Sequence, residues 1–410
     1  MSVYQEMKDS QVKAREKIQK VRKDELCTAT GMLRPGNLGD KSLKEIYRYG
    51  TWMFTKLAMS TIMVAAEELG WEKYINLLGE YQGPAQEARI NMLCDKYGIT
   101  KEDYQGYALM AHTWAKGCMF DVAAHGGRSF LSDDATSMCN DRCPQIEALR
   151  EMDLEGLKEV PRMYLWCDCY DNMFLRHMNN HCWYSHCSCL GEGKDWCISY
   201  MRDEHEPQTE ENGFYEAIKS RNDHVRNDML EDLPIPDDGL FPFTWRPVED
   251  VDMTAIAKDG PATKGSIALE SILCAIKGMG IERFLELMEE KCGIGFKKAA
   301  QDARFWANIE GREVRDAIFA VASNMFAMDF GTHIMANFNT KQGILEAPSC
   351  KIMDYAKQIG LAEEGKDMCQ FCQWYWKKVV NGVNPDIDIN FTHCCAHDGF
   401  CRAVIEKKDN

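Results

Sequence analysis

Gly70-Trp-Glu-Lys-Tyr-Ile-Asn-Leu-Leu-Gly-Glu80 is matched, at an offset of 210 residues, by Gly280-Ile-Glu-Arg-Phe-Leu-Glu-Leu-Met-Glu-Glu290. The two stretches share their glycine, apolar and acidic positions. Further along, Tyr-Ser-His-Cys at 184–187 matches Phe-Thr-His-Cys at 391–394 at an offset of 207. Because the matches keep their order and the offset changes only slowly, the sequence predicts a tandem duplication.

Each copy has the pattern of an α+β domain. Apolar residues recur at three- and four-residue spacing, as in helices that bury one face, and Gly70 and Gly280 interrupt the first helical stretch of each copy. The predicted helices fall at 43–80, 102–124, 264–291 and 312–337. Each copy then ends in alternating residues around a glycine-bearing turn, a β-hairpin pattern, at 181–201 and 387–405. We therefore expect two pseudo-symmetric copies, each a helical layer followed by a small antiparallel sheet that closes in a cysteine-bearing hairpin.

The length of 410 residues fits two domains. Six of the twelve prolines lie between Pro207 and Pro261, mixed with acidic residues, which indicates a connecting segment. The predicted organisation is an N-terminal helical arm at 1–42, a first repeat domain at 43–203, a proline-rich acidic strap at 204–263 and a second repeat domain at 264–410. The charged arm suits solvent or contacts between copies, so a homo-oligomer is one alternative.

Composition narrows the class of partner. The net charge of −16 argues against nucleic acid and against anionic membrane surfaces, which both attract basic faces. No apolar signal segment is seen at 1–25, and the most apolar stretch, Ala317–Phe338, is interrupted by charge and reads as a buried helix. We therefore expect a cytoplasmic protein. Nineteen cysteines then indicate reduced thiols or metal ligands, not a disulfide framework, and with 24 methionines they suggest an anaerobe's reducing cytosol.

Two Asp–His pairs are the predicted catalytic residues. Asp121 and His125, and at an offset of 208 Asp329 and His333, have the four-residue spacing that brings two side chains together on one helix face. A carboxylate beside an imidazole orients the ring and raises its basicity, as a general base requires. The alternative is a structural Asp–His bond that ties the helix to its domain.

Cysteines and histidines of the hairpins are the predicted metal ligands, for zinc or iron. Cys369 and Cys372 form a Cys-x2-Cys pair just before the second hairpin. The complete predicted set is Cys187, Cys189, Cys197, His186, Cys369, Cys372, His393, Cys395 and Cys401. Three alternatives stay open: cysteines packed as small hydrophobes, a thiol nucleophile, and an iron–sulfur centre between Cys139 and Cys197.

The second hairpin also carries a resemblance. Cys369-Gln-Phe-Cys372, Asn384-Pro-Asp and Phe391-Thr-His-Cys-Cys-Ala-His-Asp-Gly-Phe-Cys401, with the preceding Asp-x3-His, resemble the L-2-amino-thiazoline-4-carboxylic acid hydrolase-like family. That family is similar in outline to small-molecule-binding domains of the 4-vinyl reductase type. The resemblance covers roughly 43–202 and 264–407. It implies a hydrolase that opens a small ring containing sulfur and nitrogen, or a buried pocket for a small apolar ligand beside a cysteine-held zinc.

The sequence thus predicts a small-molecule enzyme that hydrolyses a C–N or C–S bond with an Asp–His pair and hairpin cysteines. The alternatives are a non-catalytic small-ligand or metal-binding protein and an iron–sulfur redox protein.

Overall fold

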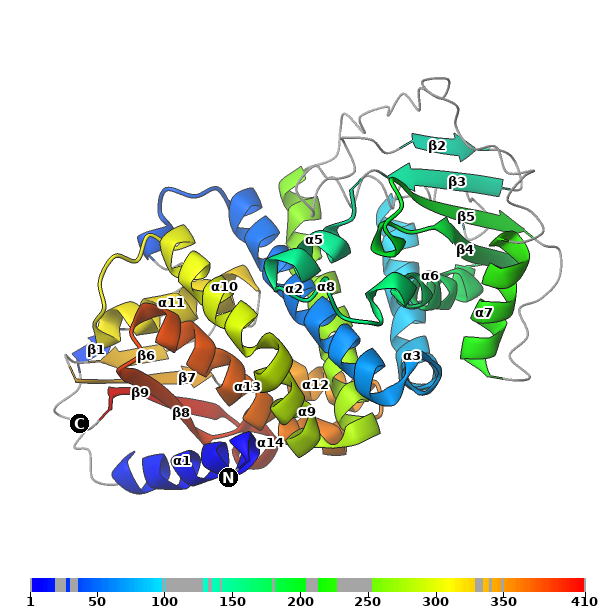
Figure 1. The fold of residues 1–410 in the computed structure, drawn as a ribbon. Coiled ribbons are helices and arrows are strands. Elements are labelled where there is room, and N and C mark those ends of the chain that lie inside the picture. The colour runs from blue at the N-terminus through cyan, green and yellow to red at the C-terminus, as the bar shows by residue number, and fades with distance from the viewer. Residues whose placement is uncertain are drawn as a thin grey trace. The chain divides into compact units, whose positions relative to one another are not determined.

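The chain divides into two units, and each unit combines helices with a small antiparallel sheet of its own (Figure 1). The prediction of an α+β fold is confirmed. The computed structural model describes residues 2–18, 27–29, 36–97, 100, 128–131, 135–140, 142–178, 181–203, 213–226, 253–328, 335–338, 341–347 and 350–408. Unit 1 comprises Met1–Val64, Glu151–Leu154 and Pro261–Asn410, and unit 2 comprises Ala65–Arg150 and Glu155–Gly260.

Unit 1 carries a five-stranded sheet in the order β1-β6-β7-β9-β8. Its strands are β1 (Cys27–Ala29), β6 (Met335–Phe338), β7 (Gln342–Ala347), β8 (Ile387–His393) and β9 (Cys401–Lys407). Its helices are α1 (Val3–Ile18), α2 (Leu43–Leu69), α8 (Met253–Met279), α9 (Ile281–Leu287), α10 (Gly293–Trp306), α11 (Val314–Ala327), α12 (Lys351–Gln358), α13 (Ala362–Val383) and α14 (Cys395–Asp398), with a short 3-10 helix at Gly36–Leu38 and a short π-helix at Met288–Cys292. Helices α2 and α8 also contribute residues to unit 2.

The core of unit 1 lies around α13, which packs against α10, α11, α12 and strand β8. Helix α11 contacts β6, β7 and β9, and α1 runs along the edge strand β8 (Figure 1). Aromatic side chains fill the space between α10 and α13, where the ring of Phe296 meets Trp374 edge-on at a centroid distance of 5.4 Å. Such rings bury large apolar areas, so α13 is firmly fixed, and it presents its cysteines to the sheet from a rigid support.

Unit 2 carries a four-stranded antiparallel sheet in the order β2-β3-β5-β4. Its strands are β2 (Arg128–Leu131), β3 (Ala135–Asn140), β4 (Cys182–Ser188) and β5 (Cys197–Asp203). Its helices are α3 (Trp71–Tyr97), α5 (Pro144–Glu151), α6 (Tyr164–Met178) and α7 (Phe214–His224), with short turns at Val160–Arg162 and Leu190–Glu192. Helix α6 packs on α3, α7 and β4.

Two glycines end long helices at the predicted places. Gly70, between α2 and α3, has φ of 77°, and Gly280, between α8 and α9, has φ of 82°. This left-handed conformation costs a residue with a Cβ atom about 1 kcal/mol or more but is open to glycine. The chain can therefore turn from one helix directly into the next.

One predicted helix was wrong in its last part. Over 312–337 the sequence predicted a single buried helix, but α11 ends at Ala327, and Met335–Phe338 forms strand β6 instead. Strand β6 pairs with β1 on one side and β7 on the other. The apolar residues of 335–338 would suit a helix or a strand. They form a strand because β1 and β7 offer backbone hydrogen bonds on both sides.

Several predicted segments lie partly or wholly outside the described residues. The helix predicted at 102–124 is one of them, as are 204–212 and 227–252 of the predicted strap. Within the strap, 213–226 contains helix α7, and α8 begins at Met253. Residues 43–64, predicted in the first repeat domain, belong to unit 1 together with Pro261–Asn410. In the part of the chain that is described, none of the helices has the length and apolar character needed to cross a bilayer.

Gly50 allows α2 to pack closely in unit 1. A Cβ atom added at this position would lie 1.8 Å from the carbonyl oxygen of Ala327. Neither backbone can yield without moving a helix, so we expect Gly50→Ala to lower the free energy of unfolding by about 3 kcal/mol, the upper range for overpacked cores. Urea denaturation measures the loss. Gly36→Ala is the control, because a Cβ atom there would have no neighbour within 4 Å; equal stability of the two variants would contradict this packing.

Candidate metal centre

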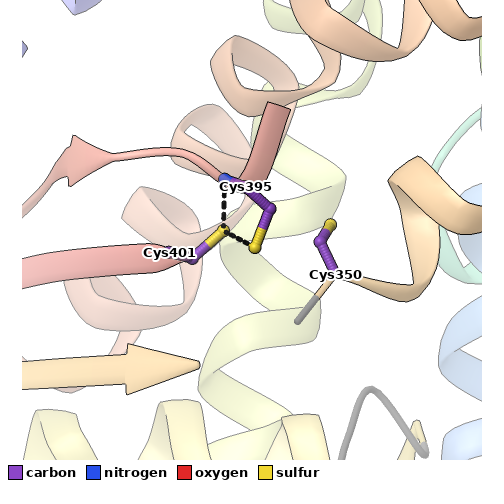
Figure 2. Close-up of side chains that lie close together, drawn as sticks. All are labelled: Cys350, Cys395 and Cys401. Atoms are coloured by element: carbon purple, nitrogen blue, oxygen red, sulfur yellow. Dashed lines mark hydrogen bonds between the residues drawn. The ribbon is translucent and has the colours of Figure 1, made fainter. Parts of the chain in front are cut away.

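Three cysteines of unit 1 meet at one end of its sheet (Figure 2). Cys350 is the N-cap residue of α12, Cys395 is the first residue of α14, and Cys401 is the first residue of β9. The pairing of Cys401 with Ala347 at the end of β7 brings the chain just before Cys350 to the same edge. Short connections between regular elements thus place three thiols together from segments about 50 residues apart.

The three sulfur atoms lie within 4.8 Å of one another. Cys401 Sγ lies 3.4 Å from Cys395 Sγ, and the Cys395 backbone N–H donates to Cys401 Sγ at 3.4 Å. Thiolates around one tetrahedral zinc ion, with Zn–S bonds of about 2.3 Å, are separated by roughly 3.8 Å. The cluster is therefore close to the spacing that a metal ion requires, and soft thiolates favour zinc or iron over magnesium or calcium.

The surroundings of Cys350 suit a ligand that loses its proton only to a metal. Its hydrogen bond to Cys401, followed by burial, raises the pKa of Cys350, while the backbone N–H groups of Met353 and Ile352 act in the opposite direction. Burial also raises the pKa of Cys395, opposed by its hydrogen bond with Cys401. The pKa values of Cys350 and Cys395 are thus raised by burial and by neighbouring groups, and a bound divalent cation would act in the opposite direction.

A fourth thiol and a disulfide lie beside the cluster. Cys372 is a half-buried free thiol of α13, and burial raises its pKa, followed by the influence of Cys350 and Cys395. Cys369, one turn earlier on α13, forms a disulfide with Cys394, with their Cα atoms 6.4 Å apart. The sequence predicted reduced thiols or metal ligands and no disulfide framework, and this pair is an exception to the reduced thiols. The bond fixes the start of α14 to α13 and removes both sulfurs from the set of free thiols.

A cavity of about 70 Å³ adjoins the cluster in unit 1. Cys350, Cys372 and Cys401 line it, and Lys351 is the one charged residue among the described residues of its wall. The apolar part of the wall consists of Met325, Ile352, Met353, Met368, Trp376 and Phe391. A small apolar molecule could occupy this space with one atom next to the thiols.

His393, a predicted ligand, is engaged elsewhere. Its ring stacks on Phe400 at 4.8 Å, and its Nδ1 atom lies 3.0 Å from the hydroxyl oxygen of Thr392. Among the predicted residues of this half, the structure brings Cys395 and Cys401 together in the cluster. It places Cys372 on the wall of the adjoining cavity and Cys369 in the disulfide.

In unit 2 the predicted residues separate into different environments. Cys187 lies in an apolar cluster with Tyr200 and Val225. Cys189 and Cys197 are joined by a hydrogen bond between their side chains. It lowers the pKa of Cys189, the residue that accepts it, and raises the pKa of Cys197.

His186 takes part in a buried network. Its Nδ1 atom lies 2.6 Å from Oδ1 of Asp168, and Oδ2 of that carboxylate accepts a 2.6 Å hydrogen bond from Asn222. Burial, the largest single influence, lowers the pKa of His186, but the charge and hydrogen bond of Asp168 together outweigh it, and the net shift is upward. Asp168 was not predicted as a functional residue. Its partner His186 lies on strand β4, so the spacing of residues along the sequence did not point to Asp168.

The four predicted catalytic residues, Asp121, His125, Asp329 and His333, lie outside the described residues. Cys350 was also missed. It lies between β7 and α12, in a segment for which the sequence analysis predicted neither a strand nor a helix.

Comparisons with protein-family models, with curated proteins and with solved structures find no match to the chain. The structure itself defines the class: an α+β protein with a three-cysteine cluster that could hold a metal ion beside an apolar cavity.

Proposed function

We propose that unit 1 is a metal-dependent enzyme that acts on a small molecule and hydrolyses a C–N or C–S bond. In this proposal, Cys350, Cys395 and Cys401 hold a zinc or iron ion. The observation that carries the proposal is that two of the three thiols, Cys350 and Cys401, also line the cavity. Three protein ligands with a fourth position open to a pocket are typical of catalytic zinc sites, whereas structural sites are closed by four.

The roles of the residues follow from their positions. A bound metal would supply Lewis-acid chemistry to a molecule in the cavity. The apolar wall, with Trp376 and Phe391, would hold the body of the substrate and exclude water from the far side. The resemblance to the thiazoline-carboxylate hydrolase-like family favours a small ring with sulfur and nitrogen, and Lys351 offers a positive charge for a carboxylate.

A second candidate is a non-catalytic ligand-binding protein. It is favoured by Cys372, because Cys350 and Cys395 are near enough to help raise the pKa of its thiol. If Cys372 supplies a fourth ligand, the centre is closed and acts as a structural clasp beside an apolar ligand site.

We also infer that the two units arose by duplication. The sheet orders β2-β3-β5-β4 and β6-β7-β9-β8 are the same once β1 is set aside. The β4–β5 and β8–β9 pairs each contain a register shift near the end of the first strand. These similarities support the repeat that the sequence predicts.

Cobalt(II) distinguishes the two candidates. We add it to anaerobically reduced, metal-free protein and record the visible bands before and after adding 2-amino-thiazoline-4-carboxylate. We expect the bands to shift, because the ring's donor atom enters the open position, and we expect ring-opened product by NMR with the zinc form. Ala347→Leu, which fills the cavity wall next to Cys401, should abolish the shift while leaving the cobalt bands in place. If the cobalt bands do not shift when the compound is added, the fourth position of the metal is closed and the proposal of an enzyme is wrong.

A further inference from the structure

A second, smaller cavity lies beside the one at the cysteine cluster of unit 1, and its volume is about 30 Å³. The two cavities share the wall residues Met325, Ala347, Trp376, Phe391 and Cys401. Cys401 belongs to the three-cysteine cluster, so the shared wall includes one of its thiols. A molecule held in the larger cavity against that thiol therefore lies next to the smaller cavity.

The floor of the smaller cavity is one face of three neighbouring strands. Cys401 and Ala403 of β9 both line it, and β9 runs between β7 and β8. Side chains two residues apart in a strand lie on the same face of the sheet. Ala403 pairs with Leu345 of β7 on one side and with Phe391 of β8 on the other, and both of these residues also line the cavity. The small side chain of Ala403 between two larger ones leaves room there.

Helices close the cavity on its other side. Val321 and Met325 lie one turn apart on α11, which packs against β7 and β9 (Figure 1). Trp376 of α13 completes the wall. Four residues that line only this cavity are at most 6% exposed, namely Val321, Leu345, Ile389 and Ala403. Because close-packed side chains of this kind yield little, the size of the cavity is well defined.

The described wall of the smaller cavity is apolar apart from the Cys401 thiol and one charged residue, Glu346. Side chains alternate along a strand, so the side chain of Glu346 lies on the opposite face of β7 from Leu345 and Ala347. There its carboxylate accepts a 2.5 Å hydrogen bond from Arg402, its partner on β9. A polar group buried without a hydrogen-bond partner is unfavourable, so this space suits a hydrocarbon group.

The volume and position of the cavity limit what fits. One water-sized group needs about 10–15 Å³ of such volume, so the cavity holds about two carbon-sized groups. A strand rises about 3.3 Å per residue, which places Ala403 about 7 Å along β9 from Cys401. A short substituent on a molecule bound beside the thiol therefore reaches the space over Ala403.

We propose that the smaller cavity is a specificity subsite for a short unbranched alkyl group, about two carbons long, on the molecule that unit 1 binds. As a statement about the substrate, this inference rests on the proposed function. The substrate is then a small ring that carries the alkyl group beside the atom that faces the metal. An amino group at that position would be buried among apolar side chains, so the alkyl-substituted ring is preferred over the 2-amino ring.

Isothermal titration calorimetry on the reduced full chain with added zinc tests the subsite. The probes are thiazoline-4-carboxylates whose 2-substituent is hydrogen, methyl, ethyl, butyl or tert-butyl. We expect the affinity to rise by at least about 10-fold from hydrogen to ethyl, because one methylene in an apolar pocket discriminates by about that factor or more, and to fall for tert-butyl. Ala403→Val fills the cavity and should remove this rise without weakening the binding of the unsubstituted ring. Val404→Leu is the control, since it adds a methylene at the next residue of β9, which does not line the cavity, and it should keep the rise.

Three results would overturn the subsite: equal affinities for the hydrogen and ethyl compounds, a rise that persists in Ala403→Val, or no binding of any compound. If Ala403→Val does not fold by circular dichroism, Leu345→Ala decides. It enlarges the same cavity and should move the best substituent from ethyl to butyl; an unchanged optimum would also overturn the proposal.

Cobalt bands and product formation with the same compounds report on the proposed function separately. If the affinity rises with alkyl length but the bands do not shift and no product forms, the subsite stands and the enzyme is wrong. If the bands shift and product forms without any preference for the ethyl compound, the enzyme stands and the subsite is wrong.

Discussion

Replacing Cys401 with serine is expected to weaken zinc binding by unit 1 by more than about 100-fold. Loss of a partner that only orients a ligand costs 10- to 100-fold, and Cys401 is itself central to the cluster. It contacts Cys395 through a sulfur–sulfur distance of 3.4 Å and accepts a hydrogen bond from Cys350. Serine keeps the size of the side chain but supplies a hydroxyl, which is a poor zinc ligand at neutral pH. Competition with a chromophoric chelator under anaerobic conditions measures the affinity.

The control is Cys274→Ser, a buried thiol of α8 outside the cluster. Both variants are made in the otherwise unchanged full chain. We expect Cys274→Ser to bind zinc like its parent. Equal affinity of the Cys401 and Cys274 variants would show that the cluster is not the ligand set. If the Cys401 variant keeps its zinc affinity but no longer responds to a small ligand, then Cys401 is a residue of the cavity wall and not a zinc ligand.

The fold class was predictable because its signals are local. Helical spacing and the positive-φ glycines at 70 and 280 report on short stretches of chain, and the structure bears out the α+β class. The end of α11 was not predictable. The stretch that follows it is apolar in either structure, and only its pairing with β1 and β7 makes Met335–Phe338 a strand.

The sequence predicted that cysteines form the site, but it did not predict every cysteine that lies there. Cys395 and Cys401 flank one turn, so their proximity could be inferred from the hairpin. Cys350 comes from a distant segment, and its approach depends on the pairing of Ala347 with Cys401. The same reasoning explains why Asp168 was missed, since its partner His186 lies on a different element, 18 residues away. Side chains that meet across elements leave no spacing rule in the sequence.

Removing the buried carboxylate of unit 2 is expected to have the largest effect on stability. Asp168 is fully buried and joins His186 to Asn222. Asp168→Ala leaves the imidazole and the amide without this partner, and breaking a buried pair typically costs about 3–5 kcal/mol. Urea denaturation should show this loss. Asp171→Asn, on the same helix, is the control, because Asp171 has a smaller influence on His186.

The milder variant Asp168→Asn separates charge from packing through its pH dependence. In the wild type the pKa of His186 is raised, so its contribution to stability is fully present below the unfolded value of about 6.5 and is lost as pH rises through the folded pKa. The charged groups that face it are Asp168 and Asp171 of α6 and the thiol of Cys189. In Asp168→Asn, burial becomes the dominant influence and lowers the pKa of His186. The contribution of His186 to stability then falls as pH is lowered, opposite to the wild type. The stability difference between the two proteins should therefore be larger at about pH 6 than at about pH 8. A difference that does not change with pH would mean that Asp168 acts by hydrogen bonding alone, with a neutral imidazole.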